Sequence, residues 1–231
     1  MDVTKKRLII YVIGLFLLAL GVSFSIQAAL GVSPLAYAFS LTTGYSVGIM
    51  SIVANILFII LQAILIKVVD LKMFGTQLII TFLFGFFIDA ALYLVQLFPT
   101  PEGLVIRWVL LVISLFVIAI GLLGYFVAKF PLMPYDALTY AISTRFKLKF
   151  TKAKITSDLI NVGIAGLVCI IFIHTLGSIG MGTIVAAYFI GKILGIIMTH
   201  FEQPLQTWLD KTNEVKQEEA RSDKEVVEAQ N

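Results

Sequence analysis

Residues 8–30 read LIIYVIGLFLLALGVSFSIQAAL, a run without one charged side chain, and this run decides the fold class. A helix needs about 20 consecutive apolar residues to cross the hydrocarbon core of a bilayer, so the run is long enough to span a membrane. None of the apolar runs alternates polar and apolar residues as a barrel strand would, and backbone in lipid must bond internally, which favours helices. Five further spans are predicted at about 47–66, 74–96, 105–128, 155–173 and 180–200.

The overall composition agrees with a membrane protein. Hydrophobic residues make up 59% of the 231 residues, charged residues only 13%, and the mean hydropathy is +0.99. Soluble domains average roughly 45–50% apolar and about 25% charged residues, so a water-facing surface could not be built from this chain. The expected partner is the lipid bilayer. The net charge of +3 lies mostly in Lys and Arg that flank the spans, which is no argument for a nucleic-acid partner.

Two shorter segments, residues 31–48 and 130–150, interrupt the series of spans. They contain prolines at positions 34, 131 and 134, and each is predicted to be a short amphipathic, re-entrant or broken helix. From residue 203 the chain turns polar and mixed in charge, which predicts a cytoplasmic tail that is either a solvated helix or disordered. The predicted domains are 1–96, 97–202 and this tail, 203–231.

Basic residues in short loops predict the orientation, because cytoplasmic loops carry an excess of Lys and Arg. If both termini lie in the cytoplasm, Arg107 is the only one of these basic residues that falls in an outer loop. The chain is thus expected to be a multi-pass protein of a bacterial plasma membrane. The residues assigned to the inner flanks are Lys5, Lys6, Arg7, Lys67, Lys72, Lys129, Arg145, Lys147, Lys149, Lys152 and Lys154.

An internal repeat is the strongest pattern in the sequence. Because each half holds three spans, an odd number, the second half must enter the membrane from the opposite side. The predicted fold is an all-α polytopic membrane protein, with six transmembrane helices as a 3+3 inverted repeat and two short re-entrant or broken helices. This architecture recurs in secondary transporters, whose binding site lies near the bilayer midplane. Alternatively, the duplication served only folding or the fusion of an ancestral dimer. The matched positions are Gly21 with Gly121, Pro34 with Pro134, Asn55 with Asn161, and Gly75-Thr76 with Gly182-Thr183.

Several stretches of the chain resemble a bacterial family. They are LGVSP at 30–34, MFGTQLIITFLFGFFIDAALYL at 73–94, MPYDALTYAIS at 133–143 and GSIGMGTIVAAYFIGKILG at 177–195. Over about residues 8–200 the chain is similar to the YczE/YyaS/YitT group of integral membrane proteins. The resemblance implies a bacterial inner-membrane location, possible transport by some members, and no known enzymatic chemistry.

Asp89 and Lys192 are charged residues inside predicted spans. A charge near the centre of a span costs roughly 2.5–3.5 kcal/mol on insertion scales, so it needs a reason. One hypothesis makes Asp89 a cation- or proton-coupling site and Lys192 an attractor of an anionic group or a counter-ion. The alternative is a structural ion pair, or a lysine whose ammonium reaches the inner surface.

Four uncharged residues complete the predicted substrate-binding set. Asn55 and Asn161 occupy matching places in the second and fifth spans, where an amide serves either as contact between helices or as a ligand contact. Tyr37 and Tyr135 follow the two proline positions, where they either line a central cavity or anchor the chain at the membrane interface.

Other polar residues are expected to have structural roles. Asp136 and Asp158 lie near basic residues and are predicted to be loop or capping carboxylates. His174 and His200 have no second ligand at metal spacing, and one cysteine, Cys169, excludes a cysteine-based metal site, so no metal or cofactor is expected.

Two functions remain open from the sequence. The first is a secondary transporter or exporter of a small organic solute, working by alternating access of the two repeats. The second is a membrane-embedded regulatory or substrate-binding subunit that acts with a partner protein. A homodimer is possible. An enzyme is not expected, because neither HExxH nor GxSxG occurs.

Overall fold

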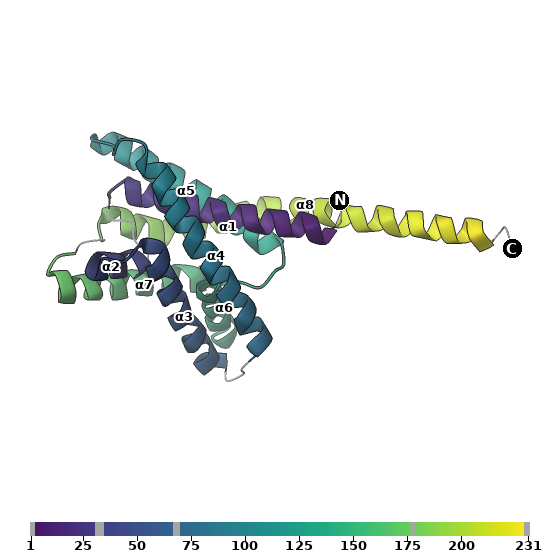
Figure 1. Cartoon of the computed structure of the whole chain (residues 1–231), viewed down its shortest axis with the longest axis horizontal. Helices are drawn as coiled ribbons and strands as arrows, with labels where there is room; N and C mark the ends of the chain where they lie inside the picture. The colour runs from purple at the N-terminus through teal and green to yellow at the C-terminus, as the bar shows by residue number, and fades with distance from the viewer. Residues whose placement is uncertain (1–2, 31–34, 67–69, 177–178, 229–231) are drawn as a thin grey trace.

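The computed structural model describes residues 3–30, 35–66, 70–176 and 179–228, and within these residues all regular structure is helical (Figure 1). The sequence-based assignment of an all-α chain is therefore confirmed. The helices are α1 (Val3–Gln27), α2 (Leu35–Thr43), α3 (Val47–Ile66), α4 (Leu71–Gln96), α5 (Leu104–Val127), α6 (Pro134–Arg145), α7 (Phe150–Ile173) and α8 (Met181–Glu228).

Six of these helices are long and apolar enough to cross a membrane, as predicted: α1, α3, α4, α5, α7 and the part of α8 from Met181 to Asp210. Large apolar side chains on their outer faces are exposed, including those of Ile79, Phe86 and Val105. Lipid rather than water suits such a surface. Helix α7 begins at Phe150, several residues before the predicted start near 155.

Each half of the chain has the same order of helices: long, short, long, long. The short members, α2 with 9 residues and α6 with 12, cannot span the bilayer. Pro134 is the first residue of α6, where its fixed φ and missing N–H suit a helix start. Pro34, at which the first break was predicted, lies outside the described residues.

The helices pack in pairs around α1 and α5, which cross at the centre (Figure 1). This crossing is close because glycines form it. A Cβ atom on Gly14 would lie 2.6 Å from the backbone nitrogen of Tyr125, and one on Gly121 would lie 2.6 Å from that of Leu18. Small residues let membrane helices approach in this way. The other pairs are α1 with α4 and α8, α5 with α8, α3 with α4, α7 with α8, α2 with α3 and α7, and α6 with α3 and α7.

Helix α8 continues without interruption through residue 203, where the tail was predicted to begin, and holds Pro204 inside it. Leu209 is fully buried in a cluster with residues of α5. Asp210 pairs with Arg7 of α1 at 2.7 Å, so the beginning of α1 lies beside α8. Beyond this contact α8 projects away from the bundle (Figure 1).

Candidate functional site

A cavity of about 180 Å³ lies inside the bundle, and all eight helices contribute residues to its lining. Its walls differ in character. Helices α1, α4 and α5 supply mainly aliphatic and aromatic side chains, while α3, α6 and α7 supply most of the polar ones. The polar residues on the second wall are Ser51, Asn55, Tyr135, Asp136, Lys154, Asp158 and Asn161.

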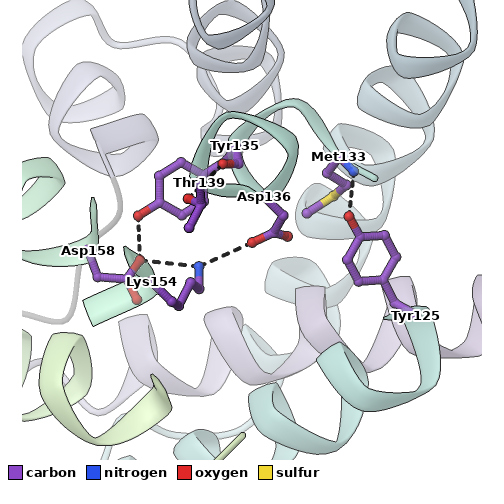
Figure 2. A network of polar contacts seen from close by, with 7 residues as sticks. All are labelled: Tyr125, Met133, Tyr135, Asp136, Thr139, Lys154 and Asp158. Carbon is purple, nitrogen blue, oxygen red and sulfur yellow. Dashed lines mark hydrogen bonds and ion pairs between the residues drawn. The ribbon is translucent and has the colours of Figure 1, made fainter. Parts of the chain in front are cut away.

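Lys154 of α7 is the centre of a buried charged cluster (Figure 2). Its Nζ lies 3.2 Å from Oδ1 of Asp158, one turn further along α7, and 3.3 Å from Oδ1 of Asp136 on α6. Only 5% of Lys154 and 1% of Asp136 is exposed. With all three groups ionised, two carboxylates face one ammonium, and the cluster carries one excess negative charge.

Tyr135 adds a hydroxyl and an aromatic face to this cluster. Its hydroxyl donates a hydrogen bond to Asp158, and its ring lies 4.3 Å from Nζ of Lys154, within cation–π distance (Figure 2). Burial raises the pKa of the Tyr135 hydroxyl well above its ordinary value, and the charge of Asp158 adds to this effect. The phenol therefore stays protonated and keeps donating. Phe58 of α3 packs against the same ring at a centroid distance of 5.1 Å.

Two tyrosines outside the cavity hold the segment that leads into α6. The backbone N–H of Met133 donates to the hydroxyl of Tyr125, a fully buried residue of α5 (Figure 2). The hydroxyl of Tyr11 on α1 donates to the carbonyl of Pro131 at 2.7 Å. These contacts fix the start of α6 and so place Asp136 at the cavity. Because Asp136 is in the first turn of α6, the positive end of the helix dipole also favours its charge.

The two asparagines bring unused acceptors to the cavity. The side-chain NH₂ of Asn55 donates to the backbone carbonyl of Ser51 at 3.0 Å, but Asn55 Oδ1 is buried and accepts nothing from the described part of the chain. Asn161 Oδ1 is in the same state. A buried polar atom without a partner costs about 1–3 kcal/mol, so each oxygen calls for a donor that the described residues do not supply.

Three residues that the sequence singled out as binding candidates thus lie at one cavity: Asn55, Asn161 and Tyr135. Tyr37 is not among the lining residues. It is half-buried on α2 and packs against the apolar core of the bundle.

Asp89 and Lys192 lie elsewhere and, within the described residues, form no ion pair with each other. Asp89 accepts hydrogen bonds from the hydroxyl of Ser46 at 2.7 Å and from the backbone N–H of Gly48 at 2.8 Å, at the start of α3. Lys192 is exposed on α8, where its ammonium lies 4.6 Å from the ring of Tyr188.

Sequence reasoning missed the charged cluster. Lys154 was assigned to a basic flank, and Asp136 and Asp158 to loops or caps, but all three meet at the cavity. Lys154 and Asp158 lie inside α7, because this helix begins at Phe150, several residues before the predicted start; Asp136 does lie in the first turn of a helix, as a capping carboxylate would. One available signal was the spacing of Lys154 and Asp158, four residues apart and hence on one helix face.

Comparison with known proteins gives a family without an assigned function. Residues 5–199 match the family of unknown function DUF6198. The chain is similar to the "Uncharacterized protein YyaS" of Bacillus subtilis (strain 168), with 29% identity over 196 residues that cover 84% of this chain and 92% of that protein. No solved structure matches. The resemblance inferred from the sequence is thereby confirmed, and this polytopic helical membrane protein belongs to the DUF6198 family.

Proposed function

We propose that the protein is a secondary transporter or exporter of a small organic solute, which works by alternating access between two inverted repeats. The observation that carries this proposal is the cavity, which both halves of the chain enclose and which has a charged wall. Buried ionisable groups inside a membrane bundle are costly and typically mark a substrate or ion pathway. We assign no catalytic step and no cofactor to this cavity.

The glycine crossing supports an inverted repeat. An offset of 100 residues matches Gly14 with Ser114 and Gly21 with Gly121. A Cβ atom on Gly14 would lie 2.8 Å from the carbonyl oxygen of Gly121, and one on Gly21 would lie 3.1 Å from that of Ser114. Gly14 thus contacts the residue that matches Gly21, and Gly21 contacts the residue that matches Gly14. Two units related by a twofold axis make contacts of this kind. In the two contacts, Gly14 with Gly121 and Gly21 with Ser114, the later residue of α1 meets the earlier residue of α5, so the two helices run antiparallel, as expected for halves of opposite orientation.

The helix pairs support the same relation. If α1 to α4 correspond to α5 to α8, the contact of α1 with α4 corresponds to that of α5 with α8, and α3 with α4 to α7 with α8. The contacts of α2 with α3 and α7 likewise correspond to those of α6 with α7 and α3. On this reading α2 and α6 are the short re-entrant helices of the two repeats, sheltered by α3 and α7.

Accessibility of the cavity tests alternating access. In a Cys169→Ala background, Ala187→Cys puts a thiol on the cavity wall and Ile184→Cys puts one on the outer, exposed face of the same helix. A small membrane-impermeant thiol reagent is then added to either side of oriented vesicles that hold the full chain. We expect Ala187→Cys to react from both sides and the control to react from neither. Reaction of the cavity thiol from one side alone, or from no side, would overturn the transport mechanism.

A second candidate, a binding or regulatory subunit acting with a partner, is favoured by one observation: α8 extends well beyond the bundle (Figure 1). The two functions differ in what the extension does. Removal of residues 211–231 should leave two-sided labelling of Ala187→Cys intact if the bundle transports by itself. The subunit function is supported instead by two results together: Ala187→Cys reacts from one side only, and the deletion abolishes the activity of the protein in cells.

A further inference from the structure

We propose that the cavity binds a small organic cation: a protonated amine on an apolar body about the size of one aromatic ring. The proposal rests on the proposed function in one respect, that the cavity is where the solute binds. It names the class of that solute from the charge, the free hydrogen-bonding atoms and the size of the cavity.

The charge of the lining selects against anions. Lys154 is the one cationic side chain among the described residues that line the cavity, and it is already shared between Asp136 and Asp158. An incoming anion would therefore find two carboxylates in the lining and no ammonium that is not already paired with them. With all three groups ionised, a cation would offset the excess negative charge, and the low dielectric of the site strengthens that attraction.

The unused polar atoms are acceptors. Oδ1 of Asn55, a residue that is 5% exposed, and Oδ1 of Asn161 have no donor in the described part of the chain. Two donors of the lining are engaged: the amide of Asn55 with Ser51, and the hydroxyl of Tyr135 with Asp158. An ammonium group offers three N–H donors and no acceptor, so it fits this surplus. A carboxylate, which only accepts, does not.

The size and the second wall define the rest of the ligand. An engineered apolar cavity of about 150 Å³ in another protein binds benzene, so about 180 Å³ admits one ring and a short amino-bearing group. Apolar side chains make up much of the rest of the lining and suit such a body. They include Leu18, Val22, Phe84, Ile88, Ile118 and Leu122. The Phe58 ring, beside Tyr135, adds an aromatic surface of the kind that attracts ammonium groups.

Three probes of one shape test the charge preference. Benzylamine, which is protonated at neutral pH, benzyl alcohol and benzoate differ mainly in charge. Each is titrated calorimetrically into the full chain in lipid nanodiscs. We expect benzylamine to bind about ten-fold or more tightly than benzyl alcohol, and benzoate not to bind. Equal binding of amine and alcohol, preference for benzoate, or no binding by any probe would each overturn the inference.

Variants locate the site. Asn55→Leu removes an unused acceptor and keeps a similar volume, and should weaken benzylamine binding about ten-fold with little effect on benzyl alcohol. Asp136→Asn should do the same. If Asp136→Asn does not fold, Asn55→Leu decides by itself. Asp70→Asn is the matched control, since Asp70 is an exposed cap of α4 and not a lining residue, and it should leave binding unchanged.

The two proposals fail separately. Benzylamine binding to a cavity that labels from one side only would keep the ligand class and reject alternating access. Two-sided labelling without a preference for benzylamine would keep transport and reject the ligand class.

Discussion

The two halves of the chain share an order of helices but not a chemistry. Counting from the matched prolines puts Ala36 opposite Asp136, and counting from the matched asparagines puts Gly48 and Ile52 opposite Lys154 and Asp158. The charged cluster is thus confined to the second half, while an asparagine occurs in both halves. Two halves with the same arrangement of helices can therefore contribute unequally to one cavity. Here the second half supplies the charged side chains, and the first half supplies mainly uncharged residues of the lining.

Loss of Lys154 should have the largest effect on stability. Lys154→Met leaves Asp136 and Asp158 buried side by side without their cation, and removal of one partner from a buried ion pair typically costs about 3–5 kcal/mol. Unfolding in detergent, followed by circular dichroism or by thermal scanning, measures this loss.

The rescue of this variant sharpens the comparison of the halves. Lys154→Met combined with Asp136→Asn and Asp158→Asn gives the second half an uncharged cluster, like its counterpart in the first half. Most of the lost stability should return, but the preference for benzylamine should not. A triple variant as unstable as the single one would show that the charges are not the reason for the loss.

Crowding of the central crossing should have the next largest effect. Gly121→Ala adds a Cβ atom 2.6 Å from the backbone nitrogen of Leu18, and overpacking of this kind costs about 1–3 kcal/mol. Gly75→Ala is the matched control, because a Cβ atom there meets nothing within 4 Å. Equal effects of the two substitutions would argue against a close crossing of α1 and α5, and so against the contact that relates the two halves.

Asp89 is the charged residue of the first half that the sequence analysis singled out, and substitution tests whether its role is structural or functional. Its carboxylate caps the start of α3 through Ser46 and Gly48, so Asp89→Ala should cost about 1–2 kcal/mol of stability. Asp89→Asn, which keeps an acceptor, should be milder and should leave benzylamine binding unchanged, unlike Asp136→Asn. Loss of solute flux in a folded Asp89→Asn protein would instead support the coupling role suggested by the sequence.

Loss of the ion pair between the beginning of α1 and α8 should have the smallest effect on stability. Arg7 and Asp210 are both partly exposed, with 21% and 48% of their side chains accessible, and such a pair contributes less than about 1 kcal/mol. Asp210→Asn should lower stability by no more than that, and the difference from the wild type should shrink as salt is added. A larger loss would mean that the pair holds α8 against α1 more firmly than its exposure indicates.

The spans were predictable because length and apolar character decide them locally, and lipid leaves helices as the only solution for such runs. Asn55 and Asn161 were visible for a related reason, since amides stand out in an apolar run. Lys154 was not visible in the same way. Close to several other basic residues it looked like one more flanking charge, and only the packing of α6 against α7 shows that it lies between two carboxylates.

Helix α8 connects the cavity to a distant point. It lines the cavity as far as Ile190 and ends at Glu228, and 38 residues of helix extend about 57 Å. If α8 tilted as one rigid helix by about 10° at the cavity, a far end at that distance would swing through about 10 Å, and the contacts of Leu209 with α5 and of Asp210 with Arg7 would have to change. A spin label near residue 228, followed by distance measurements with and without benzylamine, would report events inside the bilayer from well outside it.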